Sequence, residues 1–373
     1  MTGTTAVVVG GGSVGSAVTH RLASAGVRVT LVDGGDPAGS LSAHSFGWIN
    51  PVDNGSAPYY ALTEAALAAH RRLAESTGGG WLHQAGNLHW ADTPAGRDDL
   101  LAEAGGYRSH GYPVLELEPS AVTALEPGLR LGEVTGPVVY YPTDGHVLGD
   151  RMIAVLQDRA RELGATVITG DRVVGLTGSR RVGGVRLASG RTLAADHVVC
   201  CAGRATNELL QGLGVTIPLV EPDDPGRLVR GLLVRTTPVA GPVRRVVHAP
   251  GLSIRPAGGG RLVLRCRDVD LALTAGSRPD EFTGAVLDRL AAVLPGAAGA
   301  GVESAFLGER PIPRDGLSVL GPVRQAEGVY VAVTHSGLTL AAVVAEIVEC
   351  ELRGVPHPLA AAFRPDRLAT AAR

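Results

Sequence analysis

The feature that most constrains this chain is residues 6–33, AVVVGGGSVGSAVTHRLASAGVRVTLVD. An apolar, β-branched run over 6–9 leads into a glycine-rich turn, and apolar residues then recur at helical spacing as far as Gly26. A second apolar run over 27–32 ends at Asp33. This order predicts a strand, a helix and a second strand, the unit that holds the phosphates of a dinucleotide at a helix N-terminus.

Each glycine of the turn has its own physical role. Gly10 permits the tight turn, Gly12 lets backbone N–H groups reach a pyrophosphate, and Gly15 lets the helix and the strand pack closely. Asp33 follows about twenty residues later and is placed to accept a hydrogen bond from a ribose hydroxyl. We predict a dinucleotide site formed by Gly10, Gly12, Ser13, Val14, Gly15 and Asp33. The alternative is a glycine turn that binds nothing.

Length and composition limit the class of protein. A chain of 373 residues that is 45% hydrophobic has room for two domains, each with its own core. The formal net charge is −2 and there is no basic stripe, so a nucleic-acid partner is not expected. No apolar run approaches the roughly 18 residues of a membrane span, and no charged leader precedes the first strand. These features predict a cytoplasmic protein without a membrane partner; the oligomeric state is not readable.

The cysteines predict no metal site. Cys200, Cys201, Cys266 and Cys350 form no CxxC pair, so neither a zinc site nor a disulfide framework is expected.

Beyond Asp33 the residue composition and the hydrophobic pattern of the sequence change twice. The Gly- and Ser-rich segment 34–51 is expected to be a loop that stays close to whatever the glycine turn binds. Short β runs separated by Pro and Gly, over 228–235, 243–248, 252–255 and 261–266, predict a separate antiparallel layer. Helices are expected over 58–74, 97–107, 118–125, 151–163, 280–294 and 338–352. Residues beyond Gly354 are expected to form a loose tail.

Five sequence motifs, in a fixed order along the chain, indicate a resemblance to a known family. They are GGGSVG, SFGWIN, DGHVLGDRMIAVLQDRARELGATV, DHVVCCAGRATNELL and GERPIPRDGLSVLGP…EGVYVAVTHSGLTLA. In this order they resemble the flavin-dependent family of D-amino-acid oxidase, glycine oxidase and sarcosine oxidase. The matching motifs cover the whole cofactor half of the chain. The substrate half shares only the general pattern of short β runs and has no matching motif. One departure is Asp33, where this family more often carries glutamate, although either carboxylate can accept from a ribose hydroxyl.

The resemblance implies an α/β fold, α+β overall. A Rossmann-like FAD-binding domain would be formed by residues 1–52, 143–222 and 308–373. A mostly antiparallel β-sheet domain for the substrate would be inserted as 53–142 and 223–307. FAD is favoured over NAD because a second strand–turn–helix near the chain end can aim its helix N-terminus at the flavin.

The resemblance also implies a reaction and a set of site residues. The C–N bond of an amino acid or amine would be oxidised to an imine, with hydride passing to flavin N5 and oxygen favoured as the final acceptor. The residues expected at the chemistry are Arg310, His335, His44 and Tyr141. Those expected at the cofactor, beyond the glycine turn and Asp33, are His44, Ser45, Phe46, Gly47, Trp48, Val173, Ala202, Gly203, His335, Ser336, Gly337, Leu338 and Thr339.

Several of these residues have a simpler structural interpretation. Arg310 would pair with a substrate carboxylate, or it would only hold its loop or a neighbouring acid such as Asp315. Arg255 and Arg265 could reach the substrate, but solvated sheet arginines are the favoured interpretation. The aromatic residues Tyr140, Tyr141 and Trp48 would line the site or pack in the core.

His44 stands in a His-x-x-Gly turn, a form that is joined covalently to flavin in dimethylglycine-oxidising relatives. Non-covalent FAD is favoured, and the covalent link stays open as an alternative.

The chain contains no lysine; all 34 basic residues counted as Lys+Arg are arginines. Sarcosine-oxidase relatives use a lysine over the flavin to help oxygen accept electrons. Here either an arginine or His335 supplies that charge, or the protein is a dehydrogenase with another acceptor. An NAD-dependent enzyme and a non-catalytic flavin-binding subunit are the remaining alternatives.

Overall fold

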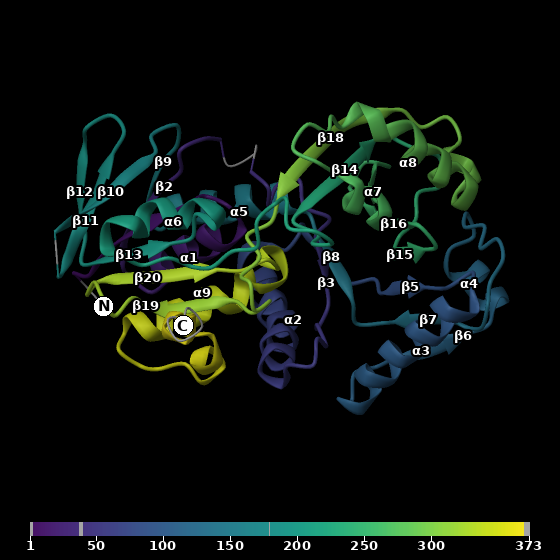
Figure 1. Ribbon diagram of the computed structural model, residues 1–373, viewed down its shortest axis with the longest axis horizontal. Coiled ribbons are helices and arrows are strands. Elements are labelled where there is room, and N and C mark those ends of the chain that lie inside the picture. The colour runs from purple at the N-terminus through teal and green to yellow at the C-terminus, as the bar shows by residue number, and fades with distance from the viewer. Residues whose placement is uncertain (1–2, 37–39, 179, 369–373) are drawn as a thin grey trace.

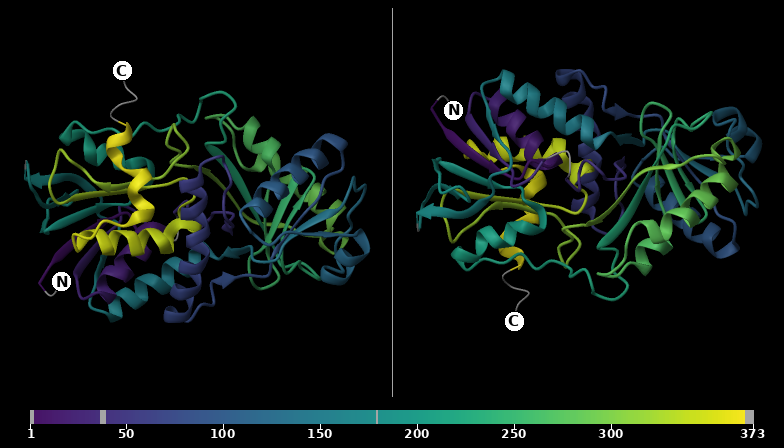
Figure 2. Two further views of the ribbon diagram at one scale, coloured as in Figure 1. Left: turned by 90° about the horizontal axis from the view of Figure 1, so that it is seen from below. Right: turned by 90° about the horizontal axis from the view of Figure 1, so that it is seen from above.

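The computed structural model describes residues 3–36, 40–178 and 180–368. It consists of two parts placed side by side along the long axis of the molecule (Figure 1). Each part is built on its own large sheet, and the chain's first strand and its last turns both lie in the first part (Figure 2).

The first part contains a six-stranded sheet. Its strands, in spatial order, are β19 (Val319–Pro322), β20 (Val329–Val333), β13 (His197–Cys200), β1 (Thr5–Val9), β2 (Arg28–Val32) and β9 (Thr166–Ile168). All neighbours run parallel except β19, which is antiparallel to β20. Parallel strands covered on both faces read as continuous apolar runs, which explains the sequence of β1.

Two apolar layers enclose this sheet. Ala6 and Val8 of β1 face the core shared with helices α1 (Ser13–Ser24), α5 (Gly149–Glu162) and α9 (Gly337–Leu352). Val7 and Val9 face the other way, towards a second core. That second core includes residues of the three-stranded sheet β10 (Val173–Gly178), β11 (Val182–Leu187) and β12 (Thr192–Ala194) and of α6 (Thr206–Leu210).

The second part contains an eight-stranded sheet. Its spatial order is β18 (Val302–Glu309), β14 (Arg230–Thr236), β17 (Leu262–Arg265), β16 (Leu252–Pro256), β15 (Val246–Ala249), β5 (Asn87–His89), β7 (Val138–Tyr141) and β6 (Leu115–Leu117). Every pair is antiparallel except β15 with β5. Its helices are α3 (Pro94–Ser109), α4 (Pro119–Leu125), α7 (Arg267–Ala272) and α8 (Asp280–Val293).

The observed packing differs from the expected division at one boundary. The expected division places segment 53–142 in the substrate part, but α2 (Ala57–Thr77) packs against α9 of the first part. Strand β4 (Leu82–His83) pairs with β8 (Gly145–Val147), which also pairs with β3 (Trp48–Ile49). The inserted sheet therefore begins only at β5, because the apolar face of α2 is buried against α9.

The expectation of a loose tail beyond Gly354 is wrong for residues 355–368, and residues 369–373 lie outside the described part of the chain. Residues Pro358–Phe363 and Pro365–Leu368 form 3₁₀ turns, and Phe363 is completely buried against the first core. Arg364 donates a hydrogen bond of 2.6 Å to the carboxylate of Glu351 in α9. Short 3₁₀ turns have no sustained helical period, so the apolar pattern of this segment is too brief to predict them.

Because Phe363 is fully buried, replacing it should be costly. We expect Phe363→Ala to lower the free energy of unfolding by about 3–5 kcal/mol, the usual cost of removing a core aromatic ring. Urea unfolding followed by circular dichroism measures this, with the exposed Leu271→Ala as the control. A loss below about 1 kcal/mol would mean that the tail contributes little to the fold.

Candidate active site

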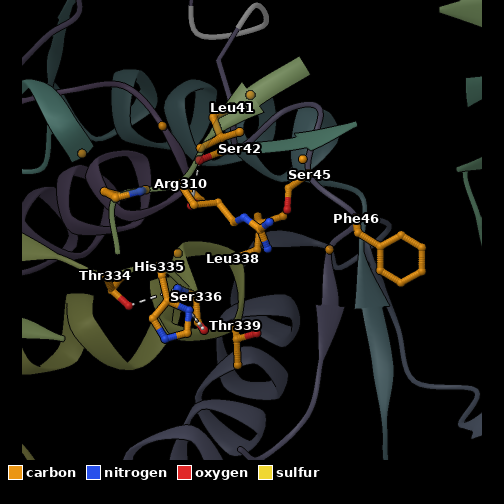
Figure 3. A pocket seen from close by; sticks show the side chains of 18 of the residues that line it. Leu41, Ser42, Ser45, Phe46, Arg310, Thr334, His335, Ser336, Leu338 and Thr339 are labelled. Atoms are coloured by element: carbon orange, nitrogen blue, oxygen red, sulfur yellow. Dashed lines mark hydrogen bonds between the residues drawn. The ribbon is translucent and has the colours of Figure 1, made fainter. Parts of the chain in front are cut away.

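A cavity of about 830 Å³ is lined by residues from both parts of the molecule. The first part contributes the turn after β1, the loop 40–50 and the start of α9. The second part contributes β14, β18 and the end of β17. Figure 3 shows ten of the lining residues with labels. The cavity therefore joins the predicted dinucleotide turn to the inserted sheet.

The glycine turn holds α1 unusually close to β1. Gly10 has a φ of +103°, and a Cβ at Gly15 would lie 1.8 Å from the Gly10 carbonyl oxygen. Gly12 caps α1 without any side-chain hydrogen bond to the first turn. The N–H groups at Ser13 and Val14, which line the cavity, are thus left for a ligand. Gly15 does not line the cavity, so its contribution is the close packing.

Asp33 lies at the cavity wall beside this turn. Its two carboxylate oxygens accept from the backbone N–H of Gly11 at 2.5 Å and of Gly35 at 2.8 Å. These contacts fix the orientation of the carboxylate, and its role as a ribose partner stays a prediction.

A second helix N-terminus opens on the same cavity. Ser336 caps α9 without a side-chain hydrogen bond to the helix, and Ser336, Gly337, Leu338 and Thr339 all line the cavity. A Cβ at Gly337 would be 3.3 Å from the Ser13 hydroxyl oxygen, so the first turns of α9 and α1 adjoin. The partly positive ends of two helices therefore face one space.

His335 precedes that helix and also lines the cavity. Its Nε2 is 3.1 Å from the Tyr59 hydroxyl and its Nδ1 is 3.1 Å from the Ser336 hydroxyl. Burial, and then the nearby charge of Arg310, lowers the pKa of His335 below 6.5. The imidazole is therefore uncharged at pH 7, which leaves the positive charge at this cavity to arginine.

The loop before β3 is fixed by a buried arginine. Ser45, Phe46, Gly47 and Trp48 line the cavity. Arg255 is only 3% exposed and donates to the carbonyl oxygens of Phe46 and of Ser45, the latter at 3.0 Å. The expectation that Arg255 is a solvated sheet arginine is wrong, because it holds this loop in place. Burial lowers its pKa to about 10, so it stays protonated at pH 7.

Three residues expected at the site lie elsewhere. The His44 ring stacks on Phe306 with centroids 4.4 Å apart, and His44 does not line the cavity. Val173 lies in the second core of the first part. Tyr141 is 3% exposed and packs edge-on against Tyr107.

Other expected residues do line the cavity, among them Ala202 and Gly203. Of the three aromatic residues expected as a wall, only Trp48 lines it.

Arg310 reaches into the cavity between the loop bearing Ser45 and the turn bearing His335 (Figure 3). Its Nη2 donates to the Arg230 carbonyl oxygen at 3.0 Å and is 3.7 Å from an oxygen of Asp270. Asp315, the acid considered as its partner, instead accepts from Arg367 at 2.8 Å. Burial lowers the pKa of Arg310 to about 10, which still leaves it charged.

The sequence analysis missed one wall of the cavity. Strand β18 contributes Phe306, Gly308 and Glu309, but its sequence VESAFLGE shows no clear alternation and predicts no strand. Arg267 and the residues Asn50, Val52, Asp53, Glu103 and Tyr107 were also missed. Non-local pairing of β18 with β14 places the wall, and no short motif encodes that pairing.

Comparison with known proteins identifies the family. The sequence model of the FAD dependent oxidoreductase (DAO) family matches residues 5–350. This chain belongs to the FAD dependent oxidoreductase family. Glycine oxidase of Pseudomonas aeruginosa is 28% identical over 359 residues, covering 90% of this chain and 91% of that protein. Glycine oxidase of Pseudomonas putida is 27% identical over 354 residues, with 90% of each chain covered.

A solved structure supports the same assignment. The crystal structure of glycine oxidase from Geobacillus kaustophilus superposes with a TM-score of 0.82 at 25% identity. The alignment covers 96% of this chain and 97% of that one. The predicted fold class, a Rossmann-like FAD-binding domain with an inserted and mostly antiparallel sheet, is thus confirmed.

The residues of this FAD oxidoreductase fit the cofactor. The glycine turn and Asp33 would supply the N–H groups and the carboxylate that a dinucleotide needs, and the adjoining first turn of α9 would offer further N–H groups to the same cavity. Within the described residues, no group of His, Cys, Asp and Glu side chains is arranged to hold a metal ion. In the same part of the chain, no helix is both long and apolar enough to cross a membrane.

Behind the cavity wall of this FAD oxidoreductase lies a buried carboxylate, Asp144. Trp48 donates to it at 2.9 Å, Tyr112 at 2.6 Å and Asn87 at 3.3 Å. Burial raises the pKa of Asp144 from 3.8 to about 7, although these hydrogen bonds oppose the shift. The Trp48 indole is therefore positioned by a group that titrates near neutral pH.

Asp144 gives a pH-dependent stability with a definite sign. Its pKa is higher in the folded protein, so its stabilising contribution is complete below about pH 4 and is lost as the pH rises through about 7. We expect wild type to lose stability relative to Asp144→Asn between pH 4 and 8, measured by urea unfolding at each pH. The exposed-site control Asp158→Asn should keep the wild-type profile. The unfolding free energy of wild type minus that of Asp144→Asn should therefore fall between pH 4 and 8. A value that stays constant or rises over this range would refute a raised pKa.

Proposed function

We propose that this protein oxidises the C–N bond of a small amino acid or amine and releases the product as an imine, which water hydrolyses. The observation that supports this is the placement of Arg310 in the same cavity as the glycine turn and the first turn of α9. FAD, once bound, would supply the hydride acceptor for this reaction. The chain's own residues then have to hold the substrate in one orientation beside it.

Arg310 is the proposed anchor for the substrate carboxylate. Its Nε and Nη2 donate to the carbonyl oxygens of Val229, at 3.4 Å, and Arg230, at 3.0 Å, which fixes the plane of the guanidinium. A fixed planar guanidinium suits a carboxylate because it can donate two parallel hydrogen bonds to the two oxygens. A carboxylate held there has its adjacent amine-bearing carbon in a defined place.

The start of α9 is the proposed contact for the flavin ring. The positive end of that helix would favour negative charge on a bound flavin, and its first N–H groups have no side-chain cap that competes. His335 is held by Tyr59 and Ser336 and is uncharged near pH 7, so it acts as a neutral polar wall.

Oxygen is the proposed electron acceptor, with hydrogen peroxide as its product. The glycine oxidase relatives favour this choice, and Arg310 is a charged, partly buried group in the cavity that can stabilise a reduced oxygen species. No lysine is present to do so. The alternative is a dehydrogenase acting on the same substrates with another acceptor.

Non-covalent FAD is the proposed binding mode. The His44 ring stacks on Phe306 and does not line the cavity. This favours tight but reversible binding over a histidyl link.

The oxidase proposal is tested by anaerobic mixing of holoenzyme with a panel of amino acids and N-substituted glycines. At least one compound should bleach the flavin absorbance near neutral pH, and admitting air should restore the colour with one hydrogen peroxide per substrate. Bleaching without peroxide or recovery in air would assign the dehydrogenase alternative. If no amine bleaches the flavin, the remaining interpretation is a non-catalytic flavoprotein.

Arg310 should affect substrate binding more than turnover. We expect Arg310→Ala to raise KM about 10- to 100-fold, the worth of a hydrogen bond to a charged group, and Arg310→Lys to recover part of the loss. The control is Arg314→Ala, an exposed arginine of the same segment paired with Asp224. Steady-state kinetics with the best substrate measure the effect, and an unchanged KM in Arg310→Ala would contradict the assigned role.

A further inference from the structure

Three arginines of the cavity lie within electrostatic reach of one another, and this grouping bears on the substrate under the function proposed above. Arg265 ends β17, Arg267 begins α7, and Arg310 follows β18; all three line the cavity. The charges of Arg265 and Arg267 both lower the pKa of Arg310, in addition to the larger effect of burial. Like charges gathered in this way are unfavourable unless anions balance them.

One carboxylate of the protein serves this cluster. Asp270 is fully buried at its side chain, and its Oδ2 accepts from Arg265 Nε at 2.7 Å and lies 3.7 Å from Arg310 Nη2. Its Oδ1 accepts from the backbone N–H of Leu232 at 2.9 Å. Both oxygens are therefore engaged, and the carboxylate is rigidly placed behind the two guanidiniums.

Two further acids, Glu309 and Asp268, are already paired with other arginines. Glu309, which also lines the cavity, lies 3.2 Å from Arg230 and 3.9 Å from Arg204. Asp268, next to Arg267 in sequence, makes a bidentate pair with Arg289. Among the residues that the structure describes, Arg267 has no ion-pair partner, and it is exposed. Arg265 and Arg310 thus share the one carboxylate of Asp270, and Arg267 adds a third guanidinium, so among the described residues the cluster carries an excess of two positive charges.

A single substrate carboxylate on Arg310 leaves that excess only half balanced. Arg265 donates to Asp270 through Nε, and its side chain is 28% exposed. Its terminal Nη groups make no hydrogen bond within the part of the chain that the structure describes, so they are left for a ligand. We propose that the cavity selects amine substrates bearing two carboxylates, with Arg310 binding the carboxylate beside the reacting carbon and Arg265 with Arg267 binding the second. This rests on the proposed amine oxidation, and it names the substrate class of that site.

The same cavity also contains two acidic side chains, Asp53 and Glu103, which predict a different substrate preference. Asp53 and Glu103 line it from the segment after β3 and from α3, and Asp53 lies 3.4 Å from His110. If these acids determined selectivity, substrates with a second amine would be preferred. The arginine cluster is favoured because Asp53 already faces a histidine, whereas Arg267 faces no acid in the described residues.

The test compares substrates that differ by one carboxylate. With holoenzyme, kcat/KM is measured for iminodiacetate against N-methylglycine and for aspartate against alanine. We expect the dicarboxylate of each pair to be preferred by about tenfold or more, as for a hydrogen-bonded charged contact. Arg267→Ala should reduce this ratio about tenfold and Arg267→Glu should invert it. The control Arg278→Ala removes an exposed arginine that pairs with Asp280 and should keep the wild-type ratio.

A binding measurement separates failure of this inference from failure of the proposed function. Malonate and acetate are titrated into holoenzyme, and the change in flavin absorbance gives each Kd without turnover. Malonate should bind about tenfold more tightly or better, with a steeper loss on adding salt, and Arg265→Gln should weaken malonate more than acetate. Equal affinities, or a preference for lysine over both amino-acid pairs, would overturn the dicarboxylate assignment even if amines bleach the flavin. Tight malonate binding without bleaching by any amine would support the anion site and overturn the oxidation.

Discussion

The contact between Gly15 of α1 and the Gly10 carbonyl determines where the rest of the site can lie. With a Cβ, Gly15 would approach that oxygen to 1.8 Å, so only glycine lets α1 start this close to β1. α9 then packs on α1, and its first residue, Gly337, adjoins Ser13. Two helix N-termini consequently share one cavity, and the inserted sheet has only to cover its open side.

Among the described residues that line the cavity, the formal positive charges belong to arginines, and Arg255 lies buried behind its loop; the guanidinium geometry explains how these cations are tolerated. Arg255 is held by the carbonyl oxygens of Ser45 and Phe46, and Arg310 by those of Val229 and Arg230. Carbonyl partners satisfy the N–H groups without cancelling the charge, which remains available to an anionic ligand. The weakly hydrated guanidinium suits such sites better than the compact lysine ammonium.

The sequence predicted the features that local patterns encode. The β1–α1–β2 unit, the turn before α9 and the cavity position of Arg310 follow from periodicity, glycine spacing and family motifs. It failed where distant pairing decides the outcome: the burial of Arg255, the strand β18 and the packing of α2 on α9. These depend on partners more than 60 residues away in the chain, as for Arg255 with Phe46 at a separation of 209.

We propose that the cavity at these two helix N-termini binds one FAD reversibly. The most direct measurement is the absorbance spectrum of purified protein before and after acid precipitation, with FAD counted per chain. The account predicts one FAD per chain, recovered in the supernatant. Colour retained in the pellet would contradict non-covalent binding and would make a covalent link through His44 the next hypothesis to test. Protein that contains no flavin and takes up none when FAD is added would contradict the claim itself.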